Sequence, residues 1–447
     1  MRDEIRKHSI PLIVIAVLGL FLLFLFHTHT LPEKDGNLYS AGSTWGDLPF
    51  HLSLIHSFAD GSNSQFGIGR GGLVHPQLAG VKLFYPFLID FYTAAWVAAG
   101  VPDRMAIITI GTGLCVVLFV LIYFLAFRIF QSRAIGILSL ILFLFSGGFG
   151  FVFFFQDFLG SHQLTVDYAH IMGTGLRNIY WSNFVPDMLL PQRASQLAIP
   201  VVVLAISLLW IRSRASLVMA GCLAGLLPLV QGHGFLVLIF LGSILCGFHL
   251  LSERRNGKLK LKSIAAWGWF FLPACILALP QFLWTFTGAP VHGFLKLIPF
   301  WMVGPEGAIV FWLMNLGLFL PIYILATRET ESGKRPFFLA FWILFLIGNV
   351  WVFQPWAYDN IKLFVYWHIT GAIAISGFLW KKFWRPADIR LRMIFPVLCF
   401  VLTFSGILSL TREAISGSSL FDLEDRALAT WVKETTSPSG IFLSGDY

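Results

Sequence analysis

Long apolar runs alternate with short polar segments along most of the chain. A transmembrane helix needs about 20 predominantly apolar residues, and shorter buried runs also occur in helical bundles. Eleven runs approach that length, at roughly 10–27, 105–127, 134–156, 196–211, 216–231, 235–251, 264–286, 308–326, 337–353, 363–380 and 393–410. The pattern predicts an all-α polytopic membrane protein with about eleven transmembrane helices.

The segment between the first two runs departs from this alternation. Residues 28–104 are largely polar and end in the shorter apolar stretch Pro86–Gly100. Loops this long are uncommon and usually functional. Because Pro86–Gly100 is short for a span, we expect a helix at the external interface there. The sequence thus predicts a membrane domain over 1–410 with 28–104 as its first external loop, and a vestigial or truncated external soluble segment at 411–447.

Composition and charge agree with a membrane protein. The chain is 57% hydrophobic and only 12% charged, which excludes a soluble globular protein. The net charge of +8 invites a nucleic-acid interpretation, but 20 of the 31 Lys and Arg lie in short segments that are internal if the N-terminus is internal, namely 1–8, 128–133, 212–214, 253–262, 328–335 and 381–392. This is the positive-inside pattern, so we expect membrane lipids and no nucleic acid as partners.

The first external loop carries the leading candidate for chemistry. Asp47 and His51 stand four residues apart in Trp45-Gly46-Asp47-Leu48-Pro49-Phe50-His51. On a helix this spacing places a carboxylate and an imidazole on one face. The pair suits either a base with its orienting partner or a metal site. The structural alternative is that Asp47 caps the N-terminus of a helix.

A second external cluster lies in the loop at 157–195. Arg193 opposes the orientation bias of the basic residues and could grip a phosphate with its two-pronged guanidinium. It could equally be an interfacial anchor. The other polar or aromatic candidates of this loop are Asp167, His170, Arg177, Asn178, Trp181, Asn183, Asp187 and Gln192.

Two more clusters follow nearer the C-terminus. His233 lies in the tight turn Gln231–Gly234, where a structural role competes with a ligand role. The segment Gln354–Lys362 contains Asp359 and Lys362, three residues apart, and Tyr366 follows inside the next span. Asp359 and Lys362 could simply neutralise each other. However, charged groups at membrane depth are costly and default to function, so we favour a polar cavity here.

Together these features resemble the polytopic type C glycosyltransferase superfamily, whose members take sugars from polyprenyl-phosphate donors. The shared layout is one span, a long first external loop with a key aspartate, a bundle of about eleven spans and an external C-terminal segment. Asp47 in Trp45-Gly46-Asp47 matches that aspartate, and Tyr85–Asp90 resembles the second half of the loop. Pro191-Gln192-Arg193 and Asp359-Asn360-Ile361-Lys362 resemble segments of uncharacterised bacterial members. The chain lacks the Asp-Glu pair and the Trp-Trp-Asp motif of the relatives that perform O-mannosyl transfer and N-glycosylation.

The resemblance implies inverting transfer of a sugar from a polyprenyl-phosphate or -diphosphate donor to a glycan, lipid or protein acceptor. The reaction would take place on the external face of a bacterial cytoplasmic membrane. Asp47, with His51, would be the base or would hold a divalent cation such as Mg or Mn. The substrate-binding residues would be Asp90, Gln192, Arg193, His233, Asp359, Asn360, Lys362 and Tyr366.

The competing interpretation is a polytopic transporter or a flippase of cell-envelope intermediates. Transporters often contain internal repeats and paired broken helices. Neither is visible in the sequence, which favours the transferase. A non-catalytic subunit or a polymerase of envelope glycans is a weaker alternative.

Overall fold

The computed structural model describes residues 7–66, 72–161, 164, 166–287, 295–437, 440 and 442. Helices dominate this part of the chain. They are α2 (Ser9–His29), α3 (Thr44–Ala59), α4 (Leu88–Ala98), α5 (Asp103–Phe130), α6 (Arg133–Phe145), α7 (Phe151–Ser161), α8 (Arg193–Ile211), α9 (Arg214–Gly225), α10 (Gly232–Arg255), α11 (Leu261–Phe286), α12 (Ala308–Leu316), α13 (Phe319–Glu329), α14 (Arg335–Val350), α15 (Ile361–Leu379), α16 (Ile389–Ile415) and α17 (Leu423–Thr435).

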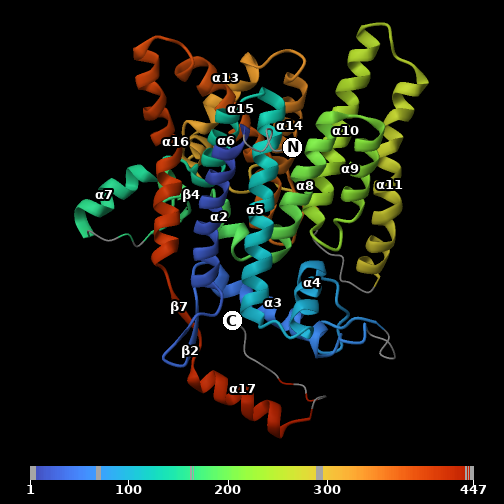
Figure 1. Cartoon of the computed structure of the whole chain (residues 1–447), viewed down its shortest axis with the longest axis vertical. Helices are drawn as coiled ribbons and strands as arrows, with labels where there is room; N and C mark the ends of the chain where they lie inside the picture. The colour runs from blue at the N-terminus through green and yellow to red at the C-terminus, as the bar shows by residue number, and fades with distance from the viewer. Residues whose placement is uncertain are drawn as a thin grey trace.

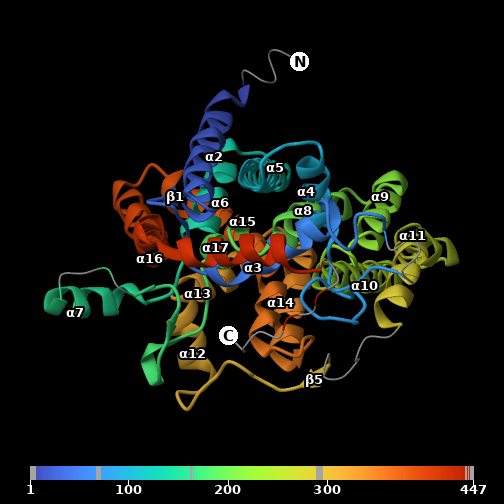
Figure 2. The same ribbon diagram turned by 90° about the horizontal axis from the view of Figure 1, so that it is seen from below.

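Helix α15 is the centre of the bundle. Almost every one of its side chains is buried, because α6, α10, α13 and α14 pack around it. Figures 1 and 2 show α9, α10 and α11 as a group on one side and α16 with the projecting α7 on the other. The fold is therefore an all-α polytopic bundle, as the hydropathy pattern predicts.

The number of full-length spans differs from the prediction. Among the described residues, seven helices are long and apolar enough to cross a membrane, or eight if α12 and α13 count as one bent span. The predicted runs at 216–231 and 337–353 correspond to the shorter helices α9 and α14. The count of eleven spans is thus not confirmed, because hydropathy does not show where an apolar run stops being helical.

Two apolar runs are broken by glycines. The run 134–156 divides into α6 and α7 around Gly148, where an added Cβ would lie 2.2 Å from the carbonyl oxygen of Met314. Ser405 of α16 donates to the Gly148 carbonyl at 2.7 Å and accepts from the Phe151 amide at 2.9 Å. It thereby satisfies backbone groups that the break sets free. The run 308–326 bends by 90° between α12 and α13, at Gly317 with φ of +56°.

The external end is built from the first loop and the C-terminal segment. Strands β1 (Glu33–Lys34), β2 (Asn37–Ser40) and β7 (Ser418–Phe421) form one antiparallel sheet in the order β1-β2-β7. Helices α3 and α4 share a small apolar core made by Leu48, Leu54, Ile55, Phe58, Leu83, Ala94 and Ile107. Figure 1 shows these elements at the lower end of the bundle with α17 below them. Helix α4 does not extend the bundle, in agreement with the interfacial helix expected at 86–100.

The remaining short strands form two separate pairs. Strand β3 (Ile171–Met172) pairs with β4 (Asn178–Ile179), and β5 (Lys296–Leu297) pairs with β6 (Trp351–Val352), both antiparallel. The first pair lies in the loop before α8 and the second fixes the segment that leads into α15. These loops carry side chains of the site described below.

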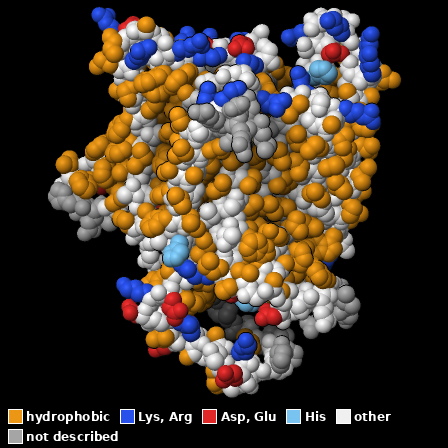
Figure 3. Space-filling view, in the orientation of Figure 1, with side chains coloured by type: hydrophobic (Ala, Val, Ile, Leu, Met, Phe, Trp, Pro, Cys, Tyr) orange, Lys and Arg blue, Asp and Glu red, His pale blue; other side chains and the backbone are white. Residues whose placement is uncertain are grey.

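Charge separates the two ends of the bundle. Figure 3 shows Lys and Arg crowded at the end opposite to α3 and α17, with a broad hydrophobic band between the ends. The last turns of α10 and α13 supply Arg254, Arg255 and Arg328 to the basic end. The chain is accordingly an integral membrane protein, and the positive-inside rule predicts that the basic end is internal.

Cysteine labelling should place Arg104 and Arg133 on opposite sides of the membrane. Arg104 lies in the first turn of α5 and Arg133 follows its last turn. We expect a membrane-impermeant maleimide to label Arg104→Cys in intact cells and Arg133→Cys only after lysis. Labelling of both in intact cells, or of neither, would contradict the assigned topology.

Candidate functional site

Helix α3 presents Asp47 near the external end of the bundle. The N-cap position of α3 is occupied by Ser43, so Asp47 lies one turn inside the helix and does not cap it. A carboxylate in the first turn is stabilised by the helix dipole. Burial raises the pKa of Asp47, while the charges of His51 and Lys362 oppose the rise and Asp359 adds to it. Asp47 is therefore half-buried, and the charges of three other sequence-predicted residues act on it.

His51 belongs to a buried chain of polar contacts. Its Nδ1 lies 2.9 Å from Oδ2 of Asp90. The other oxygen of Asp90 accepts from Nε of Arg193 at 2.9 Å. Nη2 of Arg193 also donates to the hydroxyl of Thr93. The exposed fractions are 3% for His51, 0% for Asp90 and 2% for Arg193. This chain joins α3, α4 and α8, so it fixes the helix that carries Asp47 against the bundle.

Lys362 and Asp359 form the second charged group. The ammonium lies 3.0 Å from Oδ1 of Asp359, and the exposed fractions are 16% for Lys362 and 33% for Asp359. The mutual neutralisation considered as the structural alternative to a functional role is therefore present. Because Asp359 is the more exposed partner, an incoming anion could replace it more easily than it could replace the buried Asp90.

The other predicted site residues have different surroundings. Asn360 uses its amide on the backbone of its own loop, at Gly348, Trp351 and Phe353. Gln192 accepts from the Ser195 hydroxyl at 3.2 Å, and His233 lies 3.3 Å from Nε2 of Gln354. The hydroxyl of Tyr366 is buried and has no hydrogen-bond partner among the described residues. The geometry thus groups Asp47, His51, Asp90, Arg193, Asp359 and Lys362 in two connected charged clusters and gives Asn360 a structural task.

A cavity of about 800 Å³ lies beside the first turn of α3 and was not predicted. Three parts of the chain form it: the turn before α3, the loop before α8 and the end of α16. Its lining residues are Gly42, Ser43, Trp45, Leu164, Asp167, His170, Pro186, Asp187, Arg412, Glu413, Ile415, Ser416, Gly417 and Ser418. The sequence pointed to Asp167, His170 and Asp187 as polar members of one external loop, but nothing local linked them to Glu413.

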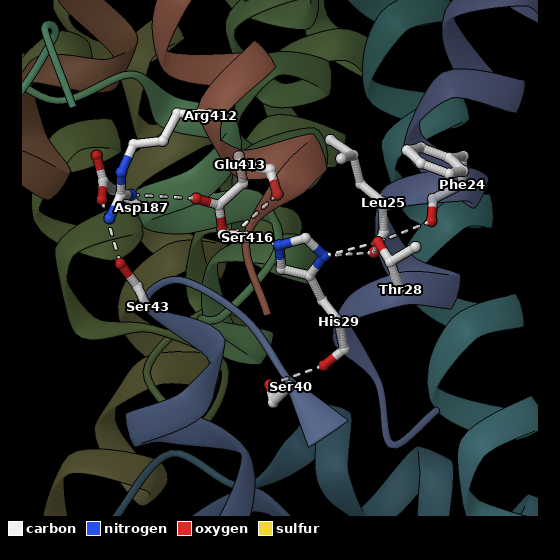
Figure 4. A network of polar contacts seen from close by, with 10 residues as sticks. All are labelled: Phe24, Leu25, Thr28, His29, Ser40, Ser43, Asp187, Arg412, Glu413 and Ser416. Atoms are coloured by element: carbon white, nitrogen blue, oxygen red, sulfur yellow. Dashed lines mark hydrogen bonds and ion pairs between the residues drawn. The ribbon is translucent and has the colours of Figure 1, made fainter. Parts of the chain in front are cut away.

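Glu413 of the cavity wall makes a buried contact with His29. Nε2 of His29 lies 2.9 Å from Oε1 of Glu413, with exposed fractions of 1% and 2%. Gly42 has φ of +52°, and an added Cβ would lie 1.9 Å from the same oxygen. Figure 4 shows this pair together with Arg412, Asp187 and Ser43. The carboxylate of Glu413 therefore joins the end of α16 to the end of α2 and lies directly against Gly42 in the turn that leads into α3.

Burial sets the protonation states of Asp187 and His170 in the cavity wall. Burial and the charge of Asp167 raise the pKa of Asp187 to about 8, although hydrogen bonds from Ser182 and Ser43 oppose the rise. Burial likewise lowers the pKa of His170. At neutral pH Asp187 is thus mostly a carboxylic acid, which can donate as well as accept a hydrogen bond.

A metal site was expected as one role for Asp47. Among the described residues, no group of three or more His, Cys, Asp and Glu side chains is arranged to hold a metal ion. His51, the nearest predicted co-ligand, directs Nδ1 to Asp90. The residues in place thus suit hydrogen bonding and proton transfer better than a complete metal shell.

Comparison with known proteins gives the fold. No protein-family model and no curated protein matches the chain in sequence. Solved structures do match. The archaeal oligosaccharyltransferase AglB from Archaeoglobus fulgidus, in complex with an inhibitory peptide and a dolichol-phosphate, aligns with TM-score 0.51 and 12% identity over 97% of this chain. The chain spans only 58% of that protein.

A second solved structure is ArnT from Cupriavidus metallidurans bound to undecaprenyl phosphate. It aligns with TM-score 0.50 and 10% identity over 96% of this chain and 81% of its own. The archaeal oligosaccharyltransferase was also solved in complex with Zn and sulfate. At these identities the likeness shows the fold alone, and that fold is the one expected from the resemblance given above.

Proposed function

We propose that this chain, which has the fold of the type C glycosyltransferases, transfers a sugar from a polyprenyl-phosphate or -diphosphate donor to an acceptor at the external face of the membrane. The observation that carries the proposal is that Asp47 lies within the electrostatic reach of the Asp359–Lys362 pair, more than 300 positions further along the chain. The polyprenyl phosphates bound to the similar structures support the same donor class.

Each charged residue has a chemical task in this proposal. The acceptor oxygen forms a bond to the anomeric carbon of the sugar, and its proton passes to the carboxylate of Asp47. The bond from the anomeric carbon to the phosphate oxygen breaks, and the phosphate leaves with the electron pair. Attack from the side opposite to the phosphate inverts the anomeric centre. A base whose pKa is raised towards the working pH is the stronger base, and burial raises that of Asp47.

The leaving phosphate is assigned to Lys362. Its ammonium can exchange the half-exposed Asp359 for the phosphate, since both are anions and Asp359 is open to solvent. Arg193 is committed to the fully buried Asp90, so we assign it to positioning, with its unpaired Nη1 as a further donor. A divalent cation at Asp47 stays a prediction, which Mn²⁺ binding measured by electron paramagnetic resonance would test.

Lys362→Gln is expected to weaken binding of the donor phosphate about tenfold or more, because a charged hydrogen bond contributes about 1.5–3 kcal/mol. Binding of undecaprenyl phosphate to the detergent-solubilised protein, followed by native mass spectrometry, measures this. Asp359→Asn should bind the phosphate at least as well as the wild type, because it frees the ammonium.

Lys296→Gln is the matched control for that experiment. Lys296 donates to the carbonyl of Pro355 in the same external region, but it has no ion pair among the described residues. Its loss should leave phosphate binding unchanged. Equal binding by wild type and Lys362→Gln would contradict the assignment of the phosphate to Lys362.

The transporter or flippase interpretation has one observation in its favour. The 90° bend between α12 and α13 is the kind of broken helix that transporters use. However, Asn315 anchors this bend to the backbone of Asn178, Tyr180 and Trp181, which makes it part of the fixed frame of the loop before α8. Transfer of labelled sugar by the purified protein in detergent, where no compartments exist, separates catalysis from transport.

A further inference from the structure

The cavity beside α3 is large enough for a polar ligand of several rings. Its volume of about 800 Å³ falls in the range of about 300–1,000 Å³ that is typical of small-molecule sites. Its walls come from three segments separated by more than 100 positions, and the buried pair between His29 and the wall residue Glu413 fixes the end of α16 against the end of α2. The cavity is therefore a built feature of the fold and not a gap between loops.

The wall combines an aromatic surface with groups that both donate and accept hydrogen bonds. The indole of Trp45 is 48% exposed and is held in place by its Nε1, which donates to the carbonyl of Ser419 at 3.1 Å. Arg412 offers donors, and Asp167 and Asp187 offer carboxyl groups. Carbohydrates need this combination, since the sugar ring has an apolar face for an aromatic ring and a rim of hydroxyls.

Asp187 has hydrogen-bonding capacity left over. Its carboxyl group accepts from the Ser43 hydroxyl at 3.3 Å through Oδ1 and interacts with Ser182, whereas its buried Oδ2 has no hydrogen-bond partner within ordinary geometry among the described residues. A buried polar atom without a partner is costly and calls for an explanation. Because Asp187 lines the cavity, a ligand hydroxyl is the partner that would satisfy this oxygen.

The cavity adjoins the proposed catalytic base. Ser43, which bonds to Asp187, precedes Asp47 by four residues, so the two share one face of α3 one turn apart. Tyr358 lies next to His170 of the cavity wall. Its hydroxyl contacts Ser182 and lies 3.3 Å from His170, while the next residue, Asp359, pairs with Lys362. The cavity wall is thus joined through Ser43 to the start of α3 and through Tyr358 to the segment that carries Asp359 and Lys362.

We propose that this cavity binds the saccharide part of the acceptor, with Trp45 as the stacking surface and Asp187 as the hydrogen-bonding group closest to α3. This inference rests on the proposed function, because it names the acceptor class for the same site. An acyl chain is disfavoured by the polar lining.

Binding to a broad array of immobilised neutral, acidic and amino glycans tests the inference without donor or transfer. We expect the intact, detergent-solubilised wild type to bind a subset of these glycans. Trp45→Ala and Asp187→Ala should lower that binding about tenfold or more, while Trp45→Phe should keep most of it because the aromatic face remains. Trp431→Ala, which removes another exposed external indole, is the matched control and should bind as the wild type does.

The other outcomes are equally informative. Absence of glycan binding, or binding that Trp45→Ala leaves unchanged, would overturn the inference. Selective binding to a peptide array would assign the cavity to a protein acceptor instead, and Mn²⁺ binding lost in Asp187→Ala would assign it to a cation. Glycan binding that persists without any sugar transfer would remove only the proposed function, whereas transfer by a protein that binds no glycan would remove only this inference.

Discussion

Asp47→Asn is expected to slow sugar transfer roughly 10²-fold or more, which is the usual contribution of a general base, while the protein remains inserted and folded. The substitution preserves size and removes the proton acceptor and its charge. Because Ser43 and not Asp47 occupies the N-cap position, α3 should form normally in the variant. Transfer from a polyprenyl-phosphate sugar by purified protein measures the effect.

The pH dependence of the rate gives an independent reading of the same residue. Burial raises the pKa of Asp47 above its ordinary value, and only the deprotonated carboxylate accepts a proton. The wild-type rate should therefore rise with pH along a limb set by Asp47, and Asp47→Asn should lack that limb. Asp60→Asn, at the exposed end of the same helix, is the control and should retain both rate and limb.

His51 distinguishes the two roles considered for Asp47. If His51 acts by holding α3 through Asp90, His51→Ala should lower the rate less than Asp47→Asn does. A comparable loss, restored by added Mn²⁺ or Mg²⁺, would indicate a shared cation. Unchanged transfer by Asp47→Asn would reject Asp47 as the base and leave the transporter interpretation ahead.

Arg193→Leu is expected to destabilise the protein by roughly 3–5 kcal/mol, the usual loss when one partner of a buried ion pair is removed. Asp90 has an exposed fraction of 0%, and Arg193 is its only guanidinium contact among the described residues. Without Arg193 its carboxylate would keep only the imidazole of His51 as a side-chain partner among the described residues. The free energy of unfolding in mixed micelles with increasing SDS measures the loss.

A double variant and a control make this prediction specific. Asp90→Leu combined with Arg193→Leu should recover part of the loss, since replacing both charges removes the uncompensated one. Arg104→Leu removes an arginine that donates to the carbonyls of Thr30 and His27 at 2.9 Å each and should destabilise less. Equal losses for Arg104→Leu and Arg193→Leu would show that Asp90 does not depend on its pairing.

The two charged clusters of the candidate site have different proposed roles, positioning for Arg193 and phosphate binding for Lys362, and charge alone does not distinguish them. Arg193 and Lys362 are both external cations next to a span, and both were assigned to substrate from the sequence. Their ion-pair partners distinguish them, because Arg193 pairs with the fully buried Asp90 and Lys362 with the partly exposed Asp359. Asn360 was also assigned to substrate from the sequence, but its amide bonds to the backbone of Gly348, Trp351 and Phe353.

Local patterns in the sequence are enough to predict the membrane class, the sidedness and the position of the candidate base. Hydropathy is a local property, so each apolar run contains a helix at its predicted place, and α4 occupies the interfacial stretch at 86–100. The positive-inside pattern is also a sum over local segments. In the same way, the unusual length of 28–104 and the spacing of Asp47 and His51 are visible without any tertiary contact.

Only the tertiary structure decided where helices break and which polar groups meet. The break between α6 and α7 depends on the hydroxyl of Ser405, more than 250 positions away. Asp90 meets His51 and Arg193 across 39 and 103 positions, and the cavity joins Trp45, Asp187 and Glu413. Such pairings are set by the packing of distant segments, because burial makes an unpaired charge costly wherever its partner lies in the sequence.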